Sequence, residues 1–244
     1  MRQIRTLGRI SADAVKLAAA LALAPLLLGC IETVGSDQVS DDAIYRTYRV
    51  TYSEESGRVL ASASFNVGGP LGTSIRLQSP SRILLNDLQL SERSFLGTTY
   101  EGDWAVPFSA EPYRWTWIDR RGDAHFERLS IVPFEVQSPP ASVSPGASLT
   151  ITMTGQSLSS EDSWGAWITQ DHADGSTRTE SLEARVLDGR RLRLDASQET
   201  RLEEGDAQLV IRRTRSAGLQ QGPSRSGTVY ATFEATPIRL RITR

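Results

Sequence analysis

Catalytic chemistry would have to centre on very few side chains, because the chain contains only two histidines. His125 and His172 lie in different halves of the sequence, each in a polar segment typical of a hairpin turn. The chain has no Gly-x-Ser-x-Gly element, and its many carboxylates show no spacing that singles out an acid and a base. We therefore expect a protein without enzymatic activity. A Ser-His-Asp triad is defined in space, so a hydrolase using one of these histidines is an alternative.

Metal binding has one candidate, the segment Asp171-His172-Ala173-Asp174-Gly175. Its carboxylates and imidazole are ligand types, and a loop of this kind could hold calcium, but the EF-hand spacing is missing. Asp-Gly also supplies the backbone angles of a tight hairpin turn. We expect a solvated turn, no metal and no other cofactor.

Two surface motifs have similar ordinary explanations. Arg121-Gly122-Asp123 spells a tripeptide known as an integrin ligand, yet Gly and Asp are the residues expected in the turn predicted there. Arginines near the C-terminus could form a docking strip for an acidic partner, or a solvated strand face that discourages edge-to-edge pairing, which we favour. They are Arg212, Arg213, Arg215, Arg239, Arg241 and Arg244.

An aromatic row is the most distinctive feature of the N-terminal half. Tyr113, Trp115 and Trp117 alternate, so in a strand they share one face of the sheet. Facing outward, the row could stack on the sugar rings of peptidoglycan or another glycan. Facing inward, it is the core of a domain, because large aromatic side chains dominate core burial. The core is the favoured interpretation, and glycan binding is the alternative.

The first thirty residues have a signal-peptide pattern. Arg2, Arg5, Arg9 and Lys16 make the start basic, and the uncharged run Leu17 to Leu28 follows. About 20 apolar residues are needed to cross a bilayer, so this run is too short for a membrane span. A basic start, a short apolar run and a small residue before the cut are typical of a secretory signal. The run ends in Leu27-Leu28-Gly29-Cys30, which contains the sole cysteine.

This segment resembles the type II signal peptide and lipobox of bacterial lipoproteins. The resemblance implies cleavage between Gly29 and Cys30, a diacylglycerol on the Cys30 sulfur, and an acyl chain such as palmitate on the new amino terminus. Two or three chains anchor a protein stably, whereas one holds it marginally. Ile31 stands where lipoproteins retained in the inner membrane often have Asp, so the resemblance favours the outer membrane and leaves open the periplasmic or surface face.

Charge limits the partners. Residues 31–43 carry four acids and no base, residues 44–133 hold ten arginines and ten acids, and residues 134–244 hold thirteen arginines and fourteen acids. Without a basic block, nucleic acid is disfavoured as a partner, because its binding depends on phosphate neutralisation. We expect an envelope protein as partner, with a glycan as the alternative.

The remaining sequence alternates apolar and polar residues with a period of two, which predicts short antiparallel strands. We expect an all-β chain: a signal peptide over 1–29, Cys30 and an acidic flexible tether over 30–43, a β-sandwich domain over 44–133, and an immunoglobulin-like β-sandwich over 134–244. Proline-rich residues 133–146 place the boundary. The expected role is a membrane-anchored, non-enzymatic binding, scaffolding or assembly module.

Overall fold

The computed structural model describes residues 33–94, 97–144, 146–158, 162–172, 174–196, 202–224 and 226–243. Its regular structure in these ranges is almost entirely β, with two short 3-10 turns, η2 (Ser36–Gln38) and η3 (Asp41–Ala43). No helix within the described ranges is long and apolar enough to cross a membrane. The predicted all-β fold class is confirmed. The signal peptide and Cys30 lie outside the described residues.

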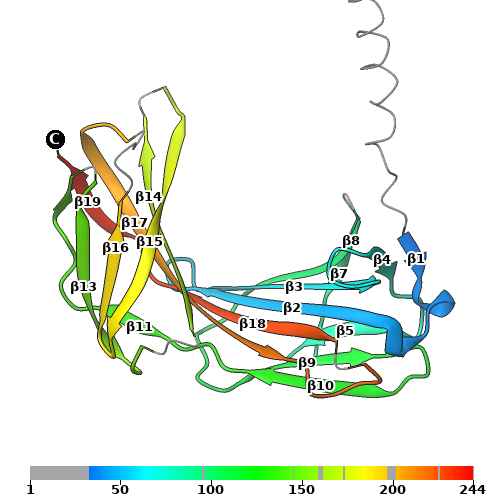
Figure 1. Ribbon diagram of the computed structural model, residues 1–244. Helices are drawn as coiled ribbons and strands as arrows, with labels where there is room; N and C mark the ends of the chain where they lie inside the picture. The colour runs from blue at the N-terminus through cyan, green and yellow to red at the C-terminus, as the bar shows by residue number, and fades with distance from the viewer. Residues whose placement is uncertain are drawn as a thin grey trace, which may run out of the picture. The chain divides into compact units, whose positions relative to one another are not determined.

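Two facing sheets form the N-terminal β-sandwich (Figure 1). The larger sheet has the order β1-β4-β3-β2-β18, with β8 also paired to β3 and β7 to β8, and the smaller sheet has the order β10-β9-β5-β6. The strands are β1 (Thr33–Gly35), β2 (Ile44–Ser53), β3 (Arg58–Val67), β4 (Thr73–Arg76), β5 (Arg82–Leu85), β6 (Leu88–Gln89), β7 (Ser91–Ser94), β8 (Thr98–Ala105), β9 (Tyr113–Ile118), β10 (Ala124–Leu129) and β18 (Gly227–Glu234).

The period-two pattern correctly identifies the inward faces of these strands. Tyr48 and Val50 of β2 are buried beside Ala61 and Ala63 of β3, whereas the residues between them face outward. A tight hairpin at Asn86-Asp87 joins β5 to β6. Both residues have positive φ, 47° and 67°, and they join Leu85 to its partner Leu88. Asn and Asp tolerate this left-handed backbone better than other non-glycine residues, which fixes the turn.

The C-terminal half has the strand pairing of an immunoglobulin-like sandwich. β11, β13, β16 and β15 pair in that order, as strands A, B, E and D do in an immunoglobulin domain, and β14, β17 and β19 pair as C, F and G. The strands are β11 (Phe134–Val136), β12 (Ser142–Val143), β13 (Ser148–Gly155), β14 (Ser163–Asp171), β15 (Thr177–Asp188), β16 (Arg191–Asp195), β17 (Gly205–Gly218) and β19 (Ile238–Ile242). The predicted immunoglobulin-like fold is confirmed by this pairing.

One hairpin carries the chain from the C-terminal sandwich into the N-terminal one. The first part of β17 pairs with β14 and β19, and its last residues, 212–218, pair with β18. β18 then pairs in parallel with β2 along its whole length, from Gly227 opposite Arg46 to Glu234 opposite Ser53. Strand pairing therefore crosses the boundary predicted at residues 133 and 134, because β18 completes the N-terminal sheet. Thr33–Arg244 is one compact unit.

The acidic segment before β2 is held against the sandwich, so the prediction of a flexible tether over residues 30–43 is wrong from Thr33 onward. β1 pairs in parallel with β4. The buried Ser36 hydroxyl accepts the Gln78 N–H at 2.8 Å, and the buried Asp41 carboxylate pairs with Arg120 at 3.1 Å. Low apolar content suggested a free segment, but backbone pairing and an ion pair fix it instead.

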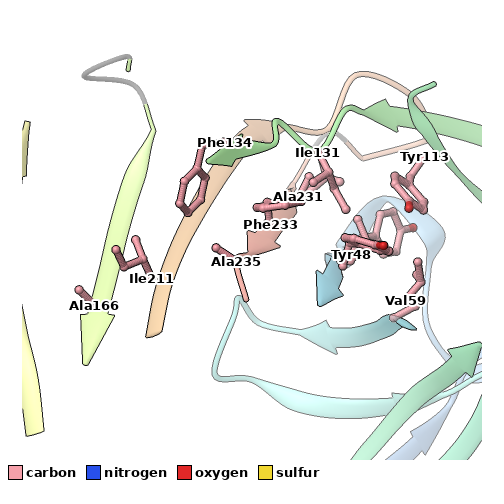
Figure 2. Close-up of a cluster of buried hydrophobic side chains, with 14 of the residues drawn as sticks. Tyr48, Val59, Tyr113, Ile131, Phe134, Ala166, Ile211, Ala231, Phe233 and Ala235 are labelled. Atoms are coloured by element: carbon pink, nitrogen blue, oxygen red, sulfur yellow. The ribbon is translucent and has the colours of Figure 1, made fainter. Parts of the chain in front are cut away.

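The hydrophobic core is continuous between the two sandwiches. Phe233 of β18 stacks on Tyr52 of β2 at 5.9 Å between ring centroids and meets Phe134 of β11 at 5.4 Å. Figure 2 shows Phe134 and Phe233 between the residues of the two halves. Burial of these aromatic rings adds apolar contact to the backbone pairing made by the β17–β18 hairpin.

Candidate functional site

The aromatic row lies in the core. Tyr113, Trp115 and Trp117 are 3%, 0% and 1% exposed. The Trp115 indole stacks on the Tyr48 ring at 5.1 Å, and Trp117 packs on Phe65 at 5.9 Å. The row therefore cannot be a platform for a glycan, and the inward-facing alternative is the one that the structure supports. The reason is that these residues face the larger sheet across the sandwich.

His125 belongs to a turn that carboxylate hydrogen bonds organise. Its Nε2 lies 2.9 Å from Asp119 Oδ2, and the other Asp119 oxygen accepts the N–H groups of Arg121 and Asp123. Burial alone would raise the pKa of Asp119, but these hydrogen bonds outweigh burial and lower it. His125 packs on the Trp117 ring, and within the described residues it contacts no hydroxyl that could act as a nucleophile.

The Arg121-Gly122-Asp123 tripeptide is the tip of this same turn. The Asp119 N–H donates to the Asp123 carbonyl, the Gly122 N–H donates to the Asp119 carbonyl, and Gly122 has a φ of 89°. A positive φ favours glycine, so the turn geometry accounts for the Gly at this position.

The Asp171 to Gly175 segment also forms a turn, and Ala173 within it lies outside the described residues. Asp174 Oδ1 accepts the hydroxyl and the N–H of Ser176, and these bonds lower the pKa of Asp174. Asp171 accepts the Thr177 hydroxyl, and His172 lies 3.8 Å from Glu203. In the described part of the chain, no cluster of three metal-ligating side chains occurs.

The C-terminal arginines do not form one strip. Arg213 faces inward, 2% exposed, and pairs with the buried Asp162, which Arg215 also contacts at 3.0 Å. Arg212 is exposed and pairs with Glu234. Arg239 and Arg241 lie exposed on β19, whereas Arg244 is outside the described residues. Arg213 therefore cannot belong to an exposed docking strip, because it lies on the same inward face of β17 as the buried Leu209 and Ile211.

A buried clamp that the sequence analysis missed holds the loop over residues 219–224, between β17 and β18. Arg46, 0% exposed, donates from Nη2 to the Gln221 and Ser224 carbonyls, the Gln221 bond being 2.9 Å. Glu127 of β10, 5% exposed, accepts the Gln220 and Gln221 N–H groups at 2.8 and 2.7 Å. We call Arg46 and Glu127 the hairpin clamp. Two charges from the N-terminal half thus hold the loop that the C-terminal half sends into it.

The Arg46 guanidinium fits between an indole and a glycine. Its Cζ lies 4.7 Å from the Trp117 ring centroid, and a Cβ at Gly222 would lie 2.7 Å from Arg46 Nη1. Gly222 also has a φ of 103°. Burial raises the pKa of the neighbouring Tyr48, against the opposing effect of Arg46. The only sequence signal for this clamp is that Arg46 is in phase with the buried Ile44 and Tyr48.

The outer face of the larger sheet carries an open groove of about 660 Å³. It extends over β2, β3, β8 and β7, on the side opposite the core. Strand register places Tyr230, Arg49, Ser62, Glu101 and Ser91 in one line across five strands. A parallel line contains Thr51, Leu60 and Asp103. In the first line, Ser62 lies between the longer side chains of Arg49 and Glu101.

Comparisons with known proteins give likenesses among solved structures only. No protein-family model matches, and no curated protein matches. The chain is similar to titin immunoglobulin tandem domains A164-A165, with 11% identity over 84% of this chain and 99% of that chain, at a TM-score of 0.21. It is also similar to the Bacteroides ovatus mixed-linkage glucan utilization locus protein SGBP-B in complex with a mixed-linkage heptasaccharide, with 12% identity over 83% of this chain and 61% of that chain, at a TM-score of 0.23. The plexin A4 extracellular region shares 9% identity over 79% of this chain and 25% of that chain, at a TM-score of 0.22.

Proposed function

We propose that this chain is a lipid-anchored protein of the bacterial envelope, attached through Cys30, whose β-sandwich part is a non-enzymatic binding or scaffolding module. The observation that carries the proposal is the position of the sole cysteine, directly after the short apolar run and three residues before the first strand, β1. A thiol at that point is the group that lipoprotein processing modifies. Ile31 favours the outer membrane as the destination.

The binding role is supported by how the two histidines are engaged. His125 and His172 each face a carboxylate, Asp119 at 2.9 Å and Glu203 at 3.8 Å, and their turns are organised by hydrogen bonds within the loop. Within the described residues, neither imidazole is hydrogen-bonded to a serine or threonine hydroxyl that could act as a nucleophile. The exposed faces of two joined sandwiches supply surface for an envelope partner.

The anchoring proposal implies a close approach to the membrane. Three residues from Cys30 to Thr33 span at most about 10 Å, because an extended chain covers roughly 3.3–3.6 Å per residue. Because β1 is the first strand among the described residues, the anchored protein would lie close to the lipid headgroups. Partners within reach would be other membrane-bound proteins or envelope polymers near the bilayer.

Intact-mass analysis of the protein extracted from membranes tests the anchor. We expect a chain that begins at Cys30 and carries the added mass of a diacylglycerol and an acyl chain. A Cys30→Ser variant should keep its leader and lose the lipid. An unmodified Cys30, or a mature protein recovered without lipid, would overturn the anchor. Affinity purification of the wild-type protein from detergent-solubilised membranes then identifies the partner.

A further inference from the structure

The groove on the outer face of β2, β3, β8 and β7 has the properties of a ligand site. Its volume of about 660 Å³ lies within the range of small-molecule and oligomer sites, roughly 300–1,000 Å³. At its centre Ser62 is half-buried, and Glu101 lies opposite it on the neighbouring strand. The short Ser62 side chain lies between the longer side chains of Arg49 and Glu101, and this leaves a hollow that a narrow chain can occupy.

The groove is lined by two arginines, Arg49 and Arg93, and by two carboxylates, Glu101 and Asp103. Arg58 pairs with Asp103 at 2.7 Å, and Arg93 pairs loosely with Glu101 at 3.9 Å. The exposed Arg49 faces the Tyr230 ring at 5.1 Å, and within the described residues it has no carboxylate partner. A guanidinium held at a ring face and free of a carboxylate is available for an anion, and it can bind a carboxylate with two parallel hydrogen bonds.

The rest of the lining favours a ligand that is rich in hydroxyl groups. Ser62, Thr51, Ser91 and Gln89 supply hydroxyl and amide groups, and Leu60, 47% exposed, supplies an apolar contact. A peptide usually binds a sheet by adding a strand at an edge. Here the groove lies on the face, where the backbone groups are already used in the strand pairing, so recognition must rely on side chains.

The line from Tyr230 to Ser91 gives the groove a direction. Five residues on neighbouring strands, about 4.8 Å apart, form an array roughly 19 Å long. The array runs across the strands, so a linear ligand would meet the side chains of successive strands along its length. A saccharide chain presents hydroxyl groups at intervals along its whole length, which suits such an array.

We propose that this groove binds an acidic saccharide chain, with Arg49 contacting a carboxylate of the sugar and Ser62 lying beneath the ring. The proposal rests on the binding role proposed above and names its ligand class. It is independent of the aromatic row in the core. Arg49, which has no carboxylate partner within the described residues, favours an acid, and the hydroxyl and amide lining favours a sugar.

Calorimetry on the full chain, purified as the cell processes it, tests this with three probes: oligogalacturonate, a neutral galacto-oligosaccharide of the same length, and polyglutamate. We expect oligogalacturonate to bind most tightly. Arg49→Ala should weaken that binding about tenfold or more, because a charge-assisted hydrogen bond is lost. Ser62→Phe should also abolish it by filling the groove, and Arg241→Ala, a matched exposed arginine on β19, should leave it unchanged.

Circular dichroism on each variant shows whether it is folded. We expect Arg49→Ala and Ser62→Phe to be folded, because both residues lie on the outer face of the sheet. Equal binding by the neutral oligomer, binding by polyglutamate that is as tight, or no heat from either saccharide would overturn the proposal. Unchanged binding in Arg49→Ala and Ser62→Phe would overturn it as well. If Cys30 is lipidated and no saccharide binds, only the groove proposal is rejected, and the anchoring proposal is unaffected.

Discussion

Removing the arginine of the hairpin clamp should destabilise the fold severely. Arg46→Met keeps most of the side-chain length but removes the donor to the Gln221 and Ser224 carbonyls. A hydrogen bond to a charged group contributes about 1.5–3 kcal/mol, so losing the two bonds of Arg46 costs about 3–5 kcal/mol, because both carbonyls are left without their donor. Loss of the contact with the Trp117 ring adds about 0.5–2 kcal/mol.

These costs are a large part of the free energy of unfolding, about 5–15 kcal/mol for an ordinary domain. We expect Arg46→Met to lower it by about 3–5 kcal/mol, since the separate contributions are not additive. Arg239→Met, an exposed arginine on β19, should change it by less than about 0.5 kcal/mol. Glu127→Gln keeps an acceptor oxygen for the Gln220 and Gln221 N–H groups and should cost less than Glu127→Ala.

Guanidinium unfolding followed by tryptophan fluorescence measures these values, because Trp115 and Trp117 are buried beside the clamp. The double variant Arg46→Met with Glu127→Ala should lose at least about 1 kcal/mol less than the sum of the single losses if both act on the same loop. A loss below about 1 kcal/mol for Arg46→Met, or strict additivity, would refute the clamp.

Three further predictions concern the same region. Gly222→Ala should lower the free energy of unfolding by about 1–3 kcal/mol, because its φ of 103° and the 2.7 Å distance from a Cβ to Arg46 Nη1 both oppose a side chain. Chemical denaturation measures this change. Gly57→Ala has the positive φ without a nearby atom, so its loss gives the cost of backbone strain alone. Because the pKa of Asp119 is lowered in the folded protein, this carboxylate stabilises the fold fully above the unfolded pKa of about 3.8, and the stabilisation disappears as pH falls through the lower native pKa. The free energy of unfolding of Asp119→Asn, measured over a pH series, should lack this acid-dependent loss. The same pH profile in wild type and Asp119→Asn would contradict the prediction. A chain ended after residue 133 should show no cooperative unfolding, because it lacks β18, and a folded monomer of that length would contradict the pairing with β2.

Local structure could be predicted from sequence because it depends on neighbouring residues. The alternation in β2 and β3 follows from burial of one sheet face, and Asn86-Asp87 follows from turn geometry. The immunoglobulin-like architecture of the C-terminal half follows in the same way from its period-two alternation, whereas its strand pairing does not. For the aromatic row, the sequence leaves two alternatives, a core face and an exposed binding face. Periodicity shows which residues share a face of the sheet, but it does not show whether that face is buried or exposed.

The clamp and the shared sheet could not be predicted because they join residues far apart in the chain. Arg46 and the loop it holds are separated by 175 residues or more, and a parallel pairing such as that of β18 with β2 leaves no local sequence signature. The fixed position of the acidic segment before β2 could not be predicted for the same reason. Its partners, β4 and Arg120, give no signal in the segment itself.

The parallel pairing of β18 with β2 also has a consequence for the order of events during biosynthesis. A ribosome makes β2 long before residue 227, so one side of that strand stays without its partner until β18 has been produced. An unpaired strand edge invites association with other chains. Cells that make this protein would therefore need to shield β2 until β18 is available to pair with it.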